Sequence, residues 1–271
     1  MQSRKKSLIV LAMVVVIMLA VVGGAAAITN GGPDGDGHPY VGLMVALDEN
    51  DNPLWRCSGT LLSETVFLTA GHCTEAPAVR ATIWFDEDVQ AGIPDNGYPF
   101  AGDVFGTAYT HPDYNPNAFF LFDLGVVELD SPMVMAEYGE LPELGVLDAI
   151  RGKYKKAALT AVGYGLQEIN PNRLSEERVR LVAALDLINT KGVFGVPRGT
   201  SIKVSGNGVG GDSSASGGTC FGDSGGPQFL ADTNIVVAVT SFGLNGNCAG
   251  SGGGYRVDQA DDLDWLATFL E

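Results

Sequence analysis

Basic residues are scarce in this chain of 271 residues, which has 16 Lys and Arg against 32 Asp and Glu and a net charge of −16. This deficit argues against a nucleic-acid partner, because nucleic acids select basic surfaces. Histidine is also rare, with only three residues. Neither the histidines and cysteines nor the acidic loops have the spacing of metal ligands, so we expect no metal site and no cofactor.

Long helical stripes, internal repeats and long linkers are absent as well. Hydrophobic residues make up 45% of the chain and charged residues only 18%, which is typical of a globular protein and excludes extensive disorder. The apolar runs are short and are interrupted by turn residues, among them many of the 37 glycines. This pattern favours an all-β architecture over a helical one.

Short apolar segments gather in two halves of similar size, roughly residues 28–150 and 151–271, and predict two β-barrels. The expected strands are Tyr40–Leu47, Gly59–Leu62, Val66–Ala70, Ala81–Phe85, Val104–Thr110 and Leu124–Leu129 in the first half, and Ala157–Val162, Val179–Ile188, Ser201–Val204, Ile235–Phe242 and Gly254–Val257 in the second. The segment Val179–Ile188 also has a partial helical pattern, but its strict alternation favours a strand.

The last ten residues and one long loop differ from this pattern. Leu263, Leu266 and Leu270 fall on one helical face, and acidic residues occupy the first turn, where they suit the helix dipole, so we expect a short C-terminal helix. The segment Ser205–Gly218 is nearly all Gly, Ser and Asn. Such a composition predicts a mobile loop.

The first 27 residues have the pattern of an export signal, and the mature chain would begin at residue 28. Three basic residues precede an apolar run that starts at Leu8 and ends in Ala25-Ala26-Ala27. A run of this length could also remain as a membrane anchor, but the small residues at its end favour cleavage. In either case we expect the rest of the chain outside the cell. Cleavage leaves 13 Lys and Arg against 32 Asp and Glu, a net charge of −19.

The four cysteines of an exported chain can pair in three ways. Cys57 and Cys73 are 16 residues apart, and Cys220 and Cys248 are 28 apart. Export implies an oxidising compartment, so we expect a disulfide within each of these couples. Each bridge should stabilise the fold by about 3 kcal/mol.

Three short motifs carry the reactive residue types: His72 beside Cys73, Asp123 within an apolar run, and Ser224 within Gly222-Asp223-Ser224-Gly225-Gly226. A serine hydroxyl becomes a good nucleophile when an imidazole takes its proton, and a carboxylate fixes the tautomer and charge of that imidazole. The motifs therefore predict a catalytic triad. The glycines allow a tight turn, so we expect the N–H groups of Gly222 and Ser224 to hold an oxyanion.

The order and spacing of these motifs resemble the trypsin and chymotrypsin family from Ile28 to the C-terminus. Val162-Gly163-Tyr164-Gly165 is similar to the family's Gly-Trp-Gly corner, and Ser241-Phe242-Gly243 resembles its Ser-Trp-Gly substrate-binding strand. The cysteines match the family's histidine-loop bridge and the bridge beside its specificity pocket. The resemblance implies two six-stranded antiparallel β-barrels with a short C-terminal helix. It also implies a monomeric serine endopeptidase whose partners are polypeptide substrates and protein inhibitors.

The resemblance further implies an activation mechanism and a pocket. In the family, cleavage creates a new N-terminal Ile or Val, whose ammonium pairs with the aspartate before the catalytic serine. The matching residues here are Ile28, which follows the expected cleavage after Ala27, and Asp223. The sequence departs from the family in reading Ile-Thr-Asn-Gly at this end instead of Ile-Val-Gly-Gly. Gly218 stands where a trypsin has an aspartate at the base of its specificity pocket. Gly243 and Gly253 match two positions in the pocket wall that leave the pocket open when they are glycine. With Ser241, Phe242 and Phe221 around this pocket, we expect a preference for large apolar or aromatic residues before the scissile bond.

Two other functions match parts of the sequence less well. The serine motif also fits the Gly-x-Ser-x-Gly pattern of α/β-hydrolase esterases, but that fold needs a histidine after the serine and none follows Ser224. A catalytically silent binding module on the protease fold generally lacks a triad member, whereas this chain keeps all three. The remaining histidines, His38 and His111, are expected in an exposed entry segment and a surface turn, without a catalytic role.

Overall fold

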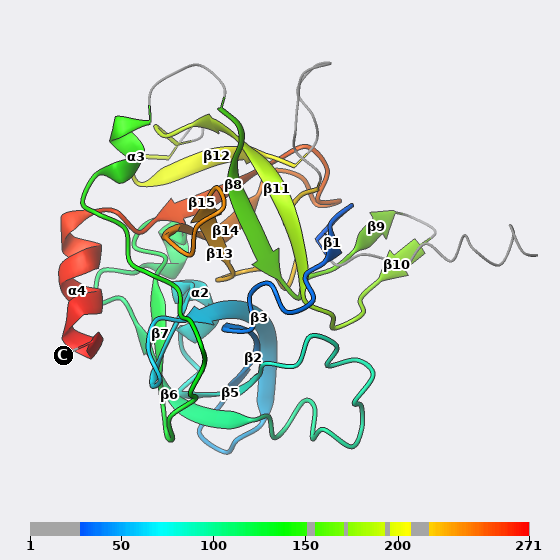
Figure 1. The fold of residues 1–271 in the computed structure, drawn as a ribbon. Coiled ribbons are helices and arrows are strands. Elements are labelled where there is room, and N and C mark those ends of the chain that lie inside the picture. Colours follow the sequence, from blue (N-terminus) through cyan, green and yellow to red (C-terminus); the bar gives the residue numbers. More distant parts are fainter. Residues whose placement is uncertain (1–27, 151–154, 171–172, 193–195, 207–216, 271) are drawn as a thin grey trace, which may run out of the picture.

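The structure is a computed structural model that describes residues 28–150, 155–170, 173–192, 196–206 and 217–270. It contains two antiparallel β-barrels that lie against each other, with a helix at the C-terminal end (Figure 1). Of the expected mobile loop, residues 207–216 lie outside these ranges.

The first barrel closes in the order β2-β3-β4-β7-β6-β5. Its strands are β2 (Val41–Leu47), β3 (Pro53–Leu61), β4 (Val66–Thr69), β5 (Arg80–Trp84), β6 (Val104–Thr110) and β7 (Gly125–Leu129). Every residue of β2 is buried, because this strand pairs on both sides and its apolar side chains fill the core.

The second barrel has the order β11-β12-β15-β14-β13-β8, and the pairing of β8 with β11 closes it. Its strands are β8 (Lys155–Gly163), β11 (Leu181–Asn189), β12 (Ser201–Ser205), β13 (Pro227–Leu230), β14 (Val236–Gly243) and β15 (Ser251–Arg256). The short β1 (Gly32–Pro33) adds to the outside of β11, and β9 (Glu168–Asn170) pairs with β10 (Arg173–Ser175). The prediction of two six-stranded barrels is confirmed.

Most predicted strands are present, with shifted ends. Val179–Ile188 is a strand, as its alternation predicts. Two strand segments differ from the prediction: β13, which directly follows two glycines and starts with a proline, and residues 53–58 of β3, which also starts with a proline, at Pro53. Proline cannot donate to a ladder and is tolerated at a strand start, so it hides these strands from pattern analysis.

The helices are few and short: α2 (Gly71–Thr74), η1 (Pro116–Ala118), α3 (Val146–Ala149) and α4 (Ala260–Leu270). The last of these is the predicted C-terminal helix, and it buries Leu266. It also buries Asp262, whereas the sequence pattern suggested only acidic residues suited to the helix dipole. None of the helices in the described ranges has the length and apolar character needed to cross a membrane.

Candidate active site

His72 and Asp123 form a hydrogen-bonded pair between the two barrels. His72 lies in α2, directly after β4, and Asp123 lies just before β7, which pairs with β4. The Nδ1 atom of His72 is 3.0 Å from Oδ2 of Asp123, and the backbone N–H of His72 donates to Oδ1 at 2.9 Å. Asp123 is fully buried. Two contacts to one carboxylate fix both the position and the orientation of the imidazole.

Asp123 is held from the second barrel as well. The hydroxyl of Ser241, on β14, donates to Oδ2 of Asp123 at 2.5 Å. Phe122, the residue before the aspartate, adopts a left-handed backbone conformation with φ of 51° that turns the chain sharply here. Ser241, which the sequence placed in the substrate-binding strand, therefore also supports the buried carboxylate.

Ser224 lies on a turn that packs against the segment leading to His72. A Cβ atom on the next residue, Gly225, would lie only 2.0 Å from Oγ1 of Thr69 and 2.6 Å from the nitrogen of Ala70. Gly225 also has a φ of 77°, so glycine is required here for two reasons. The amide of Ser58 donates to the carbonyl oxygen of Ser224 at 2.8 Å and fixes the turn from the first barrel.

Both Ser224 and His72 line one cavity of about 580 Å³. No hydrogen bond joins these two side chains within the described part of the chain. Such contacts are often long in enzymes without substrate and shorten when it binds. The arrangement thus provides a hydroxyl, an imidazole and a buried carboxylate around a single cleft.

The pKa of His72 lies above its usual value of 6.5. Burial of the ring opposes its charged form, but the charge of Asp123 and its hydrogen bond favour that form and outweigh burial. An imidazole with a raised pKa is a better base toward a serine hydroxyl.

The turn before Ser224 presents two unoccupied donors. In the described ranges, the backbone N–H groups of Gly222 and Ser224 donate to no protein acceptor. Gly222 has a φ of 96°, and its carbonyl oxygen accepts a hydrogen bond from the hydroxyl of Ser58 at 2.9 Å, which fixes the orientation of the turn. Ser58 was not identified from the sequence, because a single serine after Cys57 carries no recognisable signal.

Known proteins resemble this chain along most of its length. The family model for Trypsin matches residues 30–265. The chain belongs to the trypsin family. Serine protease 1 of Drosophila melanogaster is 28% identical over 88% of this chain and 84% of its own length. Collagenase of Hypoderma lineatum is 26% identical over 78% of this chain and 74% of its own length.

Solved structures agree on the fold. The structure of HL collagenase covers 92% of this chain and 98% of its own, with a TM-score of 0.65 and 21% identity. The structure of human heparin binding protein covers 92% of this chain and 96% of its own, with a TM-score of 0.62 and 20% identity. At these identities the likeness concerns the fold alone.

As in the family's pattern, Asp223 precedes the serine, and here it is completely buried. Its carboxylate accepts the N–H groups of Gly165 and Cys220, each at 2.8 Å. Burial raises the pKa of Asp223 to about 7, although these hydrogen bonds and the charge of Arg56 act in the opposite direction. A buried carboxylate of this kind gains most from a cationic partner.

The segment after residue 27 reaches the same region. Ile28 is fully buried, and Thr29 exchanges two backbone hydrogen bonds with Gly218, at 2.8 and 2.9 Å. Gly218 is six residues before Ser224. In the uncleaved chain the nitrogen of Ile28 is an uncharged amide, and within the described ranges no hydrogen bond joins it to Asp223.

The predicted pocket residues divide between two cavities. Phe221, Ser241, Phe242 and Gly243 line the large cleft beside Ser224. Phe119 and Leu244 add further apolar surface to this cleft, with 41% and 47% of their surfaces exposed. The sequence analysis did not select these two residues.

Gly218 borders a second cavity of about 10 Å³, which Gly252 also lines. Thr219 and Gly243 line both the large cleft and this cavity. This volume accommodates about one water molecule. Gly253 does not line it, because the ring of Phe242 covers the face where its Cβ would be, at 2.2 Å. Gly252, the residue before it, borders this cavity instead.

The structure pairs Cys57 with Cys73 and Cys220 with Cys248, as the sequence predicts. The first bridge lies beside His72, and the ligand atoms of Cys57, His72 and Cys73 lie within 4.8 Å of one another. Because the two sulfurs are bonded to each other, this cluster offers only one free ligand, the imidazole.

Proposed function

We propose that the protein is an exported serine endopeptidase in which His72 activates Ser224 and Asp123 orients His72. The observation that carries this proposal is the bidentate contact of His72 with the buried Asp123, on the same cleft as Ser224. His72 takes the proton of Ser224 as its oxygen attacks the peptide carbonyl, and later gives a proton to the leaving amine. Water then hydrolyses the acyl-enzyme by the same route. Relatives named Serine protease 1 and Serine protease 2 support the reaction class.

The N–H groups of Gly222 and Ser224 are the proposed oxyanion hole. Their lack of protein acceptors in the described ranges supports this role, since a developing oxyanion needs donors that are already free. Activation follows from cleavage after Ala27, which converts the nitrogen of Ile28 into an ammonium. This ammonium is the proposed partner of Asp223, which is buried and bonds to no cation among the described residues; this supports the pairing.

The proposed substrates are polypeptides with an apolar residue before the scissile bond. The small cavity is bordered by glycines, Thr219 and Cys248 and has no charged lining residue in the described part of the chain. Its volume favours small apolar residues over the aromatic ones that the sequence suggests. Large apolar side chains fit the wider cleft near Phe119, Phe242 and Leu244, which would receive residues further upstream.

Peptide-library profiling of the mature protein tests both activity and preference. We expect cleavage after Ala to be faster than after Phe, and the Ser224→Ala variant to lose turnover while keeping its melting temperature within a few degrees. Equal cleavage after Phe would show that the small cavity opens and would refute the size limit. Cleavage by Ser224→Ala at the wild-type rate would refute the assignment of the nucleophile. A folded wild-type protein that cleaves nothing would favour the silent binding module.

A further inference from the structure

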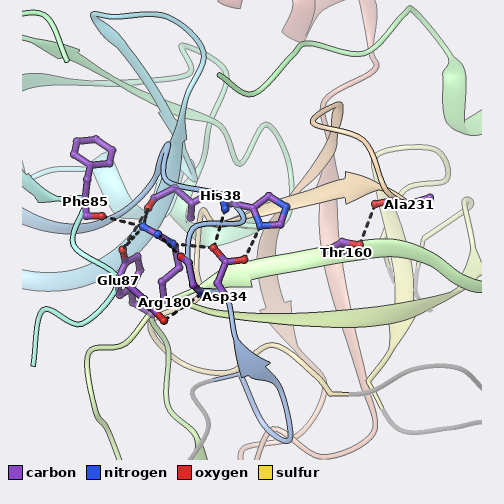
Figure 2. A network of polar contacts seen from close by, with 10 residues as sticks. Asp34, His38, Phe85, Glu87, Thr160, Arg180 and Ala231 are labelled. Carbon is purple, nitrogen blue, oxygen red and sulfur yellow. Dashed lines mark hydrogen bonds and ion pairs between the residues drawn. The ribbon is translucent and has the colours of Figure 1, made fainter. Parts of the chain in front are cut away.

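Arg180 lies just before β11, is buried, and reaches the N-terminal segment (Figure 2). Its Nε donates to Oδ2 of Asp34 at 2.9 Å, and its Nη2 donates to the carbonyl oxygen of Gly35 at 2.8 Å. The amide of Asp34 in turn donates to the carbonyl oxygen of Arg180 at 3.1 Å. The other carboxylate oxygen contacts Nδ1 of His38 at 2.6 Å. This buried network fixes the N-terminal segment to β11.

The same guanidinium also reaches the corner that holds Asp223. Its Nη1 donates to the hydroxyl of Tyr164 at 3.2 Å and to two carbonyl oxygens of the first barrel. Gly165, the next residue, donates its N–H to Asp223. Arg180 therefore bonds to the N-terminal segment through Asp34. Through Tyr164 it also bonds to the corner whose next residue, Gly165, donates to Asp223.

The N-terminal segment continues from Asp34 back to Ile28, over six residues, and pairs with Gly218 at Thr29. After cleavage this stretch is a free chain end. The effective concentration of a tethered group falls roughly as the −3/2 power of the tether length. Without the hold on Asp34, the segment keeps only the two-residue pairing of β1 with β11 at Gly32 and Pro33. When this short pairing opens, the next strand that holds the segment begins at Val41 in β2, thirteen residues from Ile28. The longer tether lowers the effective concentration of the Ile28 ammonium about threefold.

We propose that Arg180 is a positioning residue of the protease: by holding Asp34, it keeps the cleaved Ile28 end against the loop of Asp223. This inference rests on the proposed function. Lysine cannot replace this arginine, because a single ammonium cannot serve the carboxylate, the carbonyl oxygens and the tyrosine hydroxyl together. An apolar residue would fill the space but would leave Asp34 buried without a cation.

Amide hydrogen exchange tests, independently of catalysis, whether the contact between Arg180 and Asp34 holds the N-terminal segment in place. The mature chain is prepared with Ser224→Ala to prevent self-digestion, and Asp34→Asn, Arg180→Lys and Arg178→Lys are compared on this background. Arg178 is the matched control, because it bonds to Gln90 and to the carbonyl oxygen of Glu176 and does not contact the N-terminal segment. We expect exchange at the amides of Thr29 and Gly218 to be at least threefold faster in the first two variants and unchanged in the control. Unchanged exchange in Asp34→Asn overturns the proposal.

The pH profile of peptide hydrolysis tests the effect on the active site. The Ile28 ammonium must be protonated to pair with Asp223, so activity is lost as the pH rises through its pKa in the folded enzyme. A threefold lower effective concentration of the ammonium lowers the pH of this alkaline loss of activity by about 0.5 unit. The charged or titratable groups that face Asp34 are the guanidinium of Arg180 and the imidazole of His38, and Arg56 faces Asp223.

We expect the shift in Asp34→Asn and not in Arg178→Lys. If Asp34→Asn lowers the melting temperature but changes neither the alkaline limb of the pH profile nor the exchange rates of Thr29 and Gly218, Arg180 has a structural role only. That result overturns the proposal. An inactive wild type, or one whose N-terminus is not Ile28, contradicts the proposed function instead. In that event the exchange rates still decide whether Arg180 holds the segment.

Discussion

At the scale of single residues, the chemistry depends on a carboxylate that water does not reach. Asp123 is fully buried and accepts contacts from His72 and from Ser241. Taking a charge out of water is costly unless such partners are present. In the proposed reaction, the aspartate stabilises the imidazolium while its own position remains fixed.

Replacing Asp123 by asparagine should lower kcat about 10⁴-fold, because the amide favours the wrong tautomer of His72. KM should change little, since Asp123 does not line the cleft. Activity in the wild type should rise with pH through the pKa of His72, which lies above 6.5 because the charge of Asp123 outweighs burial. Without that charge the acid limb should move to lower pH. Peptide hydrolysis measured as a function of pH gives both quantities, and an unmoved limb would contradict the pairing.

At the scale of elements, α4 places a carboxyl group directly behind the loop that carries Asp123. Asp262 is completely buried, accepts a hydrogen bond from the hydroxyl of Tyr255 at 3.0 Å, and lies 3.8 Å from Nε2 of His111. His111 stacks on Phe122 with ring centres 5.1 Å apart. The expectation that His111 lies in a surface turn is therefore wrong in one respect, because its ring is buried against the residue before Asp123.

Burial raises the pKa of Asp262 to about 8, with the neighbouring aspartates adding to the effect. In the unfolded chain this carboxyl titrates near 4. Its stabilising contribution is therefore complete below pH 4 and is lost as the pH rises toward 8, by about 1.4 kcal/mol per unit of pKa difference.

The Asp262→Asn variant should remove this loss, so the free energy of unfolding should fall less between pH 5 and pH 8 than in the wild type. Tyr255 can still donate to the amide oxygen, which keeps the packing. The exposed Asp264, two residues away, provides the control Asp264→Asn. Denaturant unfolding at several pH values measures the difference, and parallel curves for wild type and Asp262→Asn would show that this carboxyl is not the source.

Local signals account for what could be predicted from the sequence. The residues around His72, Asp123 and Ser224 carry short motifs, and the strands alternate clearly, so the fold class and the candidate triad could be identified. Pairing between distant segments has no such signal. Asp34 and Arg180 are 146 residues apart, and neither has neighbours that suggest a buried ion pair. His38 was expected to be exposed for the same reason, yet it stacks on Phe229 and contacts Asp34.

At the scale of the whole molecule, the proposed triad draws its residues from both barrels. His72 and Asp123 belong to the first barrel, while Ser224 and Ser241 belong to the second (Figure 1). The cleft between them is lined from both sides, from Tyr114 and Phe119 on one and from the β14 strand on the other. The size of the small pocket could not be predicted, because it depends on how Thr219 and Gly252 approach each other across strands of the second barrel.

Labelling of the mature exported protein with a fluorophosphonate, followed by mass spectrometry, tests the central claim most directly. The account predicts one label per chain, attached to Ser224, on a chain that begins at Ile28, and no label after Ser224→Ala or His72→Ala. A folded chain that begins at Ile28 and stays unlabelled, while an active trypsin reacts under the same conditions, would contradict it.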